Sequence, residues 1–283
     1  MTYRKTNTVD KKPLITVLMP AYNIELYIDQ AIESILNQTF KNFEFLIIDD
    51  ASSDKTLSVI KFYMKKDKRI KLIINKKNSK IAWTLNKGIK EAKGEIIARM
   101  DPDDISYPDR LLTQLSFLKK HPKVAIVGSN IIIINSAGKV ISKREYPTTS
   151  ARMKSLMFRY SPFAHPAIMF RKNIFEEFGC YDVNMEQAED LDLWFKIGSK
   201  YEFATIPKTL LQYRILPSSG FHNNLKSVEI FSFKIKLNAI FKYGYKVSVY
   251  DIFYNFTEFI LLWLIPDKIR VWSYNFLRSK KLI

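Results

Sequence analysis

The sequence holds little cysteine, glycine or proline: one Cys, eight Gly and eleven Pro in 283 residues. Because Cys180 has no second cysteine to pair with, an internal disulfide and a multi-cysteine zinc cluster are excluded, and a reducing compartment is favoured. The low glycine and proline content argues against long linkers and low-complexity tails. The polar start, MTYRKTNTVDKKP, lacks the apolar core of a secretory signal. These absences indicate an ordinary globular chain, with the size of one large domain or two fused units.

Positive charge is what the sequence has in excess. Lysine and arginine number 45 against 28 aspartates and glutamates, which gives a formal net charge of +17. Residues 55–93 alone hold 13 basic and 2 acidic side chains. This charge permits nucleic acid, anionic lipid or a phosphate-bearing substrate as a partner, and it fits a solvated lysine-rich face equally well.

The first 118 residues alternate between short apolar runs and apolar residues at helical spacing. Apolar runs at 15–19, 43–48, 70–74 and 95–100 predict four strands. Helical stripes follow the first three runs, at Ile28, Ala31, Ile32, Ile35 and Leu36, then at Leu57, Ile60 and Met64, then at Ile81, Leu85 and Ile89. The alternation predicts a mostly parallel sheet covered by helices on both faces, with ligands bound beyond the carboxyl ends of the strands.

The alternation becomes less regular after residue 118. Residues 124–134 are strongly β-prone, 136–138 predict a turn, and 167–170 predict a strand. Residues 188–199 return to a helical pattern, and 201–206 and 210–214 predict two more strands. We expect an added layer of the same domain.

Acidic residues gather where the predicted strands end. The segment DPDD at 101–104 follows the fourth strand, and the carboxylates of Asp101 and Asp103 can converge on one point. Oxygen ligands without a nearby His or Cys cluster suit Mg²⁺ or Mn²⁺ shared with substrate phosphates. Capping of the following helix is the alternative for DPDD, and also for Asp49 and Asp50 after the second strand.

Four segments stand in order along the chain: ITVLMPAYN at 15–23, IIDDASSDKT at 47–56, IARMDPDDISYPDRL at 97–111 and FGCYDVNMEQAEDLDLW at 178–194. Together they resemble the successive signatures of the inverting glycosyltransferase family 2, and the resemblance covers residues 14–215. It implies an α/β chain with the GT-A fold, in which helices flank a mostly parallel central sheet. It also implies transfer of a sugar from a UDP- or dTDP-linked donor.

The resemblance assigns donor-side roles. Residues that would lie against the nucleotide-sugar are Pro20, Ala21, Tyr22, Asn23 and Glu25, with Tyr22 near the base. Asp50 would accept a hydrogen bond from the ring imide of uracil or thymine. Asp101 and Asp103 would form the DxD pair, with Asp101 near the ribose or the metal and Asp103 on the Mn²⁺ or Mg²⁺ that bridges the two phosphates.

The resemblance also assigns acceptor-side roles. Asp190 matches the general base that takes the proton of the attacking hydroxyl, and Glu189 would orient Asp190 or contact the acceptor. His165 matches a position that faces the acceptor cleft, with structural packing as the alternative. Trp194 is a further candidate for the acceptor site.

One departure from the family concerns the metal. Many relatives follow a Tyr-Arg pair with a histidine that completes the metal site, but Tyr213-Arg214 continues as Ile-Leu-Pro here. His222 is left as a substitute ligand or an ordinary loop histidine. The QxxRW motif of processive synthases is also absent, which favours transfer of one sugar per encounter.

The last 59 residues change in character. Residues 225–283 contain 14 aromatic side chains against 25 in the preceding 224, with ten basic and four acidic residues. Asp251, Glu258 and Asp267 leave no uninterrupted apolar run of the roughly 20 residues that span a bilayer. The pattern predicts helices in the interface of an anionic membrane, and the alternative is a hairpin packed on the catalytic domain or on a second subunit.

These observations divide the chain into a lead at 1–13, a nucleotide-sugar-binding half at 14–118, an acceptor-binding half at 119–224 and an aromatic, basic helical extension at 225–283. We expect a cytoplasmic enzyme, peripheral on the inner face of a bacterial cytoplasmic membrane. It would act in capsule, O-antigen or lipooligosaccharide assembly, without a nucleic acid partner and with an oligomer left open.

Two functions other than sugar transfer fit the sequence less well. A sugar nucleotidyltransferase usually carries a glycine-rich phosphate loop after its first strand, whereas PAYN and the following IELY contain no glycine. A non-catalytic basic module that binds membrane or RNA leaves the carboxylates at three strand ends unexplained, since they would repel phosphates without a metal.

Overall fold

The computed structural model describes residues 12–185, 188–216, 225–265 and 269. Its first elements alternate along the chain: β1 (Ile15–Ala21), α1 (Ile28–Leu36), β2 (Phe43–Asp49), α2 (Thr56–Lys66), β3 (Ile70–Ile74), α3 (Lys80–Glu91) and β4 (Ile96–Arg99). The second half contains β5 (Ile105–Ser106), α4 (Arg110–Lys120), β6 (Val124–Ile134), β7 (Val140–Arg144), α5 (Ser150–Leu156), a 3₁₀ turn (His165–Ala167), β8 (Met169–Arg171), α6 (Ile174–Phe178), α7 (Glu189–Gly198) and β9 (Glu202–Arg214). Two helices follow, α8 (Leu225–Phe241) and α9 (Val249–Leu264).

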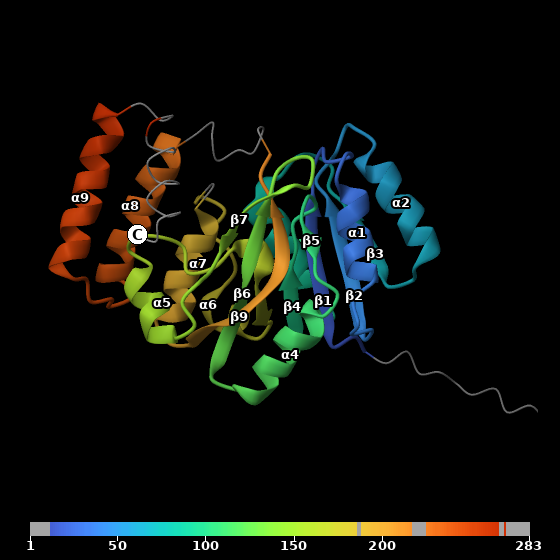
Figure 1. The fold of residues 1–283 in the computed structure, drawn as a ribbon, viewed down its shortest axis with the longest axis horizontal. Coiled ribbons are helices and arrows are strands. Elements are labelled where there is room, and N and C mark those ends of the chain that lie inside the picture. The colour runs from blue at the N-terminus through green and yellow to red at the C-terminus, as the bar shows by residue number, and fades with distance from the viewer. Residues whose placement is uncertain (1–11, 186–187, 217–224, 266–268, 270–283) are drawn as a thin grey trace, which may run out of the picture.

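One sheet runs through both halves in the order β3-β2-β1-β4-β8-β6-β9-β5, with β7 paired to β6 (Figure 1). The strands β3, β2, β1 and β4 are parallel, as the alternation predicts. Strand β8 is antiparallel to both β4 and β6, so it joins this parallel half to the pair β6 and β9. The expected α/β architecture is confirmed, and the added strands make the sheet mixed beyond β4.

The central strands are buried on both faces, which explains their unbroken apolar runs. All seven residues of β1 and all seven of β2 are buried. In β1, Ile15, Val17 and Met19 belong to the core beneath α1, α2 and α4, whereas Leu18 belongs to the core beneath α3. A Cβ on Gly88 of α3 would lie 2.2 Å from Leu18 Cδ1, so this glycine lets α3 approach the sheet closely.

Two local predictions were wrong. The segments 201–206 and 210–214 form one strand, β9, because the 11-residue β6 pairs with it along its whole length through register shifts near Ser129 and Asn130. In α2 the inward residue is Tyr63 and not Met64, which is 39% exposed. Tyr63 can be buried because its hydroxyl donates to Glu33 Oε1 on α1 at 2.9 Å.

The last two helices form a hairpin at one end of the long axis, next to α7 (Figure 1). Helix α8 places Ile235 and Ala239 in the core, and Tyr245 after it donates to the carbonyl oxygen of Phe195 at 3.2 Å. The hairpin therefore packs on the rest of the chain through α8, in line with the alternative reading of residues 225–283. Among the described residues, no helix combines the length and apolar character needed to cross a membrane.

Candidate active site

The loops that follow β1, β2 and β4 meet at one edge of the sheet (Figure 1). Ala21 at the end of β1 lies beside Asp49 at the end of β2, and Met100 after β4 donates to the carbonyl oxygen of Leu18 at 3.0 Å. The segments PAYN, DDASSD and DPDD are therefore neighbours, as expected for the carboxyl ends of parallel strands.

The first two of these loops are joined by hydrogen bonds from polar side chains. Asn23 has a positive φ of 46°, and its Oδ1 accepts from the backbone N–H of Ser53 at 2.8 Å. Glu25 Oε2 accepts from the backbone N–H of Lys55 at 2.7 Å. Asn23 and Glu25 thus shape the loop pair. Of the other predicted nucleotide-binding residues, Pro20 and Ala21 are buried in β1, and Tyr22 is 46% exposed.

Asp50 is buried and its carboxylate anchors the loop before α3. Its Oδ1 accepts from Asn75 Nδ2 at 2.6 Å, and both oxygens accept from the backbone N–H of Ser79 at 3.0 Å. Oδ2 also accepts from the backbone N–H of Lys80 at 3.0 Å. These donors occupy about the four acceptor positions that a carboxylate offers. Binding of a nucleobase by Asp50 would have to displace one of them, and that role stays a prediction.

Three carboxylates converge in the turn after β4. Asp101, Asp103 and Asp104 each place one oxygen within 4.8 Å of the others. Burial, then the charge of Asp101, raises the pKa of Asp103 to about 7. Burial and the two neighbouring carboxylates raise the pKa of Asp104 well above its usual value. Asp104 Oδ2 is buried without a hydrogen-bond partner among the described residues. The turn therefore offers a compact set of anionic oxygens, one of them unused.

The buried side chain of Arg214 fixes this turn from the end of β9. Its backbone N–H donates to Asp104 Oδ1 at 2.8 Å, and its Nε donates to the carbonyl oxygen of Asp103 at 2.8 Å. Its Nη1 donates to the carbonyl oxygens of Asn135 and Ser136, and its Nη2 donates to Gln30 on α1 at 2.8 Å. One guanidinium thus ties the acidic turn to α1 and to the turn between β6 and β7.

A second acidic pair begins α7. Burial, then the charge of Asp190, raises the pKa of Glu189 to about 7, and Glu189 Oε2 is buried without a hydrogen-bond partner among the described residues. Burial also raises the pKa of Asp190, whose Oδ1 accepts from the backbone N–H of Leu191 at 2.7 Å. A carboxylate whose pKa is raised toward neutrality suits proton abstraction.

Arg99 pairs with Asp101, and its charge also acts on the acidic residues that begin α7. Its guanidinium makes a bidentate pair with Asp101, with both N···O distances at 2.6 Å. Burial opposes its charge, but Asp101 and Asp104 hold the pKa of Arg99 above its usual value. The same positive charge opposes the rise that burial causes in the pKa of Glu189 and of Asp190. The turn after β4 and the start of α7 therefore share one buried counter-ion.

His165 and Trp194, two further candidate site residues, contact each other. His165 Nε2 is 2.8 Å from the hydroxyl of Tyr181, and burial with the charge of Arg99 lowers the pKa of His165 well below its usual value. Trp194 is fully buried and meets the His165 ring edge-on at 5.6 Å. Trp194 thus belongs to the core, where it can support His165 but offers no exposed surface to an acceptor.

Asn86 links α3 to the segment before α7. Its Nδ2 donates to the carbonyl oxygen of Tyr181 at 2.8 Å, and its Oδ1 accepts from the backbone N–H of Tyr181 at 2.9 Å. This pair of bonds fixes the distance between α3 and the segment before α7. His222 lies outside the described residues.

Sequence patterns missed Arg99, Asp104 and Asn86 as parts of the site. Asp104 is the last residue of DPDD, but the spacing of the motif pointed only to Asp101 and Asp103 as carboxylates that converge. Arg99 is the last residue of β4, where alternation alone predicts a side chain on one of two covered faces. Its burial beside Asp101 depends on β8, whose position no local pattern gives.

Comparisons with known sequences bear on this site. A family model described as "Glycosyl transferase family 2" matches residues 16–179, which is more than half of the chain. The chain is 38% identical to the Bacillus subtilis protein EpsE over 187 residues, 65% of this chain and 66% of that protein. It is 32% identical to the O-antigen biosynthesis glycosyltransferase WbnJ of Escherichia coli over 227 residues, 79% of this chain and 88% of that protein.

A comparison with solved structures concerns the fold. The mannosyltransferase PcManGT from Pyrobaculum calidifontis, in complex with GDP-Man and Mn²⁺, superposes with a TM-score of 0.62 at 18% identity. The match covers 89% of this chain and 69% of that one. The likeness shows a shared GT-A-like fold.

Proposed function

Since this chain belongs to glycosyltransferase family 2, we propose that it transfers a sugar with inversion from a UDP- or dTDP-linked donor to a hydroxyl of a glycan or lipid-linked acceptor. One observation carries the proposal: the acidic turn at 101–104 and the acidic start of α7 share the buried counter-ion Arg99. Two carboxylate groups with different tasks are therefore held next to each other.

We assign the general base to Asp190. In a single displacement the acceptor oxygen bonds to the anomeric carbon, the bond from that carbon to the diphosphate breaks, and the hydroxyl proton passes to the base. The raised pKa of Asp190 supports this role, because it brings the proton affinity of the carboxylate closer to neutral pH. Glu189 would orient Asp190 or contact the acceptor, and His165 would remain neutral beside them.

We assign the donor to the loop pair after β1 and β2 and to the acidic turn. Tyr22 is exposed next to the ordered loop around Asn23 and Glu25, which supports a role in stacking on the base. Asp50 holds the neighbouring loop at Ser79 and Lys80. Even if the base displaces none of its donors, Asp50 would shape that side of the pocket.

The acidic turn fits a divalent cation, Mn²⁺ or Mg²⁺. The site holds more carboxylates than guanidiniums. The five carboxylates are those of Asp101, Asp103, Asp104, Glu189 and Asp190, and the three guanidiniums are those of Arg99, Arg110 and Arg214. If all of them were ionised, two negative charges would be unbalanced. Burial, and then the charge of Asp101, raises the pKa of Asp103, so without a cation this group would tend to hold a proton. Asp101, Asp103 and the unused Oδ2 of Asp104 would hold the ion. When bound, the cation would neutralise charge on the departing diphosphate.

Polysaccharide assembly is the setting we propose, since the similar WbnJ is named for O-antigen biosynthesis. A lipid-linked acceptor would place the enzyme at the inner face of the cytoplasmic membrane. The family match disfavours the two alternatives, a sugar nucleotidyltransferase and a non-catalytic basic module.

A donor panel tests the proposal. Purified protein is incubated with UDP-, dTDP- and GDP-sugars, with and without Mn²⁺, and free nucleoside diphosphate is measured. We expect Mn²⁺-dependent release from a UDP- or dTDP-sugar. A GDP-sugar as the only substrate would contradict the nucleotide assignment. Formation of a nucleotide-sugar from a sugar phosphate and a nucleoside triphosphate would contradict the reaction itself.

A further inference from the structure

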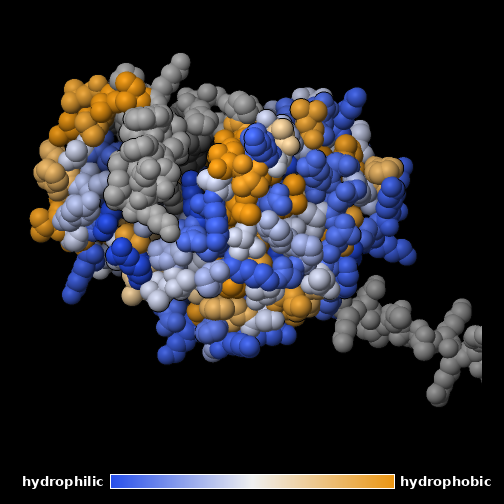
Figure 2. All heavy atoms as spheres, viewed as in Figure 1, coloured by the Kyte–Doolittle hydropathy of each residue, from blue (hydrophilic) through white to orange (hydrophobic). Residues whose placement is uncertain are grey.

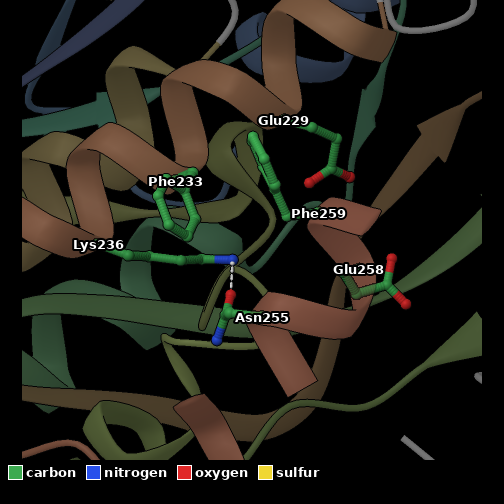
Figure 3. Close-up of a pocket in the computed structure, with 6 residues that line it drawn as sticks. All are labelled: Glu229, Phe233, Lys236, Asn255, Glu258 and Phe259. Carbon is green, nitrogen blue, oxygen red and sulfur yellow. Dashed lines mark hydrogen bonds between the residues drawn. The ribbon is translucent and has the colours of Figure 1, made fainter. Parts of the chain in front are cut away.

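Helix α9 turns its polar residues toward the protein. Asp251 is buried, and its Oδ1 pairs with Arg159 Nε on the main body at 2.6 Å. Asn255 Oδ1 accepts from Lys236 Nζ of α8 at 2.7 Å, and Figure 3 shows this bond in a small cavity between the two helices. Glu258 lines the same cavity. The inner face of α9 is thus charged and hydrogen-bonded.

The outer face of α9 is apolar. Its exposed residues recur every three or four positions and so share one side of the helix: Val249, Ile252, Phe253, Phe256, Ile260, Trp263 and Leu264. Phe253 is 70% exposed and Leu264 is 71% exposed. Figure 2 shows apolar residues gathered at the upper left, over one end of α9. Surface helices of water-soluble domains have the reverse arrangement, with the apolar stripe facing the core.

Buried polar contacts prevent this helix from turning over. Rotation that buried the apolar face would separate Asp251 from Arg159 and leave Lys236 without Asn255. Lys236 is half-buried, and this burial lowers its pKa, while the carboxylates of Glu229 and Glu258 offset that effect. Losing partners for buried charges is costly. The outward direction of the apolar face is therefore a property of the folded chain.

The charges around this face select its partner. Lys242 and Lys246 are exposed in the loop before α9, and Lys226 Nζ lies 5.6 Å from the ring centroid of Trp263 near the other end. Both acidic residues of α9, Asp251 and Glu258, belong to the inner side. An apolar strip bordered by lysines matches the acyl chains and anionic headgroups of a membrane interface. A second copy of the chain would oppose lysines to lysines, which disfavours a symmetric dimer through this face.

We propose that the outer face of α9, the seven residues named above, docks into the interface of a membrane containing anionic lipid. The helix would lie along the surface, since no described helix can span a bilayer. The inference rests on the proposed function only in that a lipid-linked acceptor would be reached there. A binding experiment without substrate separates the two, because loss of catalysis would not change its result.

Co-sedimentation of the full-length chain with vesicles tests the proposal. We expect binding to phosphatidylcholine vesicles that contain phosphatidylglycerol, weaker binding without it, and release by salt. The double variant Phe253→Ser/Phe256→Ser should reduce the partition coefficient about tenfold or more, since it removes two inserted aromatic side chains. The matched control is Phe62→Ser, which removes a phenylalanine 52% exposed on α2 and should bind like the wild type. Lys242→Gln/Lys246→Gln should weaken binding to anionic vesicles only.

Three results would overturn the proposal. The first is a full-length chain that stays in the supernatant with anionic vesicles at low salt. The second is wild-type binding by the double variant. The third is a dimer in light scattering that the double variant converts to a monomer, which would make a second copy the occupant of this face. Thermal unfolding of each variant verifies that the folded protein is compared.

Discussion

At the residue scale, the site depends on carboxylates whose charges are only partly balanced. Arg99 is shared between Asp101 and the pair on α7, so no single carboxylate has a cation of its own. In the function we propose, this arrangement would let Asp190 take a proton and the acidic turn take a cation. Proton transfer to Asp190 and cation binding by the acidic turn can be tested separately.

Replacing Asp190 by asparagine should abolish most of the transfer while donor binding persists. The amide is nearly isosteric but cannot accept the hydroxyl proton, so kcat should fall by about 10²-fold or more. Asp192→Asn is the matched control on the same helix: it removes a carboxylate paired with Lys196 and should keep most of the turnover. Near-normal kcat in Asp190→Asn would show that another group is the base.

The acid limb of the pH profile should lie above the range of an exposed carboxylate. The base works when deprotonated, and since burial raises the pKa of Asp190, activity should be lost as pH falls through a range above the usual one for aspartate. Burial also raises the pKa of its neighbour Glu189, to about 7. An exposed carboxylate would lose activity only near pH 4. We expect this in kcat/KM measured between about pH 5 and 9 at saturating Mn²⁺.

Glu189→Gln provides the internal check on that profile. Because the two carboxylates titrate as a coupled pair, removal of one charge should move the acid limb to lower pH. An unchanged limb would exclude the α7 pair as its origin.

Asp103→Ala should weaken Mn²⁺-dependent donor binding about tenfold or more, because it removes an anionic oxygen from a cluster of three. Titration calorimetry with a UDP-sugar, with and without Mn²⁺, measures this effect. Asp109→Ala is the control, since Asp109 lies nearby but pairs with Lys208 at the surface. Equal donor affinity in Asp103→Ala and the wild type would exclude a metal role for Asp103.

At the scale of elements, the end of β9 supports the acidic turn. Arg214→Lys keeps the charge but cannot reproduce contacts to Asp103, Asn135, Ser136 and Gln30 at once. Each hydrogen bond lost contributes about 0.5 to 1.5 kcal/mol, and several are lost together, so we expect a clear fall in Tm and a weaker donor affinity. Arg152→Lys, at an exposed position of α5, is the control. A variant of Arg214 with unchanged Tm would show that the turn holds itself.

How much the sequence could predict differs between the two halves of the sheet. In β1 to β4 each strand and its helix are neighbours in the chain, so local periodicity predicted the strands and their parallel arrangement. Beyond β4 the pairings join distant segments, and β8 lies between β4 and β6 although 34 residues separate β6 from it. Such contacts have no periodic signature, so the family resemblance singled out Asp190, but nothing in the sequence pointed to Arg99, whose charge acts on it.

The same limit applies to the helix faces. In α2 the spacing fits either Tyr63 or Met64 beneath Ile60, and only the partner Glu33 on another helix decides. In residues 225–283 composition predicted an apolar, basic surface, while the packing of α8 depends on contacts with α7 that composition cannot give.

At the scale of the whole molecule, α8 is part of the core and not a detachable tail. Ile235 is 1% exposed in the same core as Trp194 and Phe195. Ile235→Ala should therefore lower the free energy of unfolding by about 2 to 5 kcal/mol in urea denaturation. Ile230→Ala, at a position 46% exposed on the same helix, should cost far less. Equal small effects would indicate that α8 is only loosely attached.

We propose that a donor side built on β1 to β4 and an acceptor side built around α7 carry out a single displacement at the anomeric carbon. Proton NMR of the first-formed product measures the stereochemistry of this step. With an α-linked nucleotide-sugar and Mn²⁺, we expect a β-configured product from the wild type and little product from Asp190→Asn. A first-formed product that retains the α configuration would contradict the single displacement.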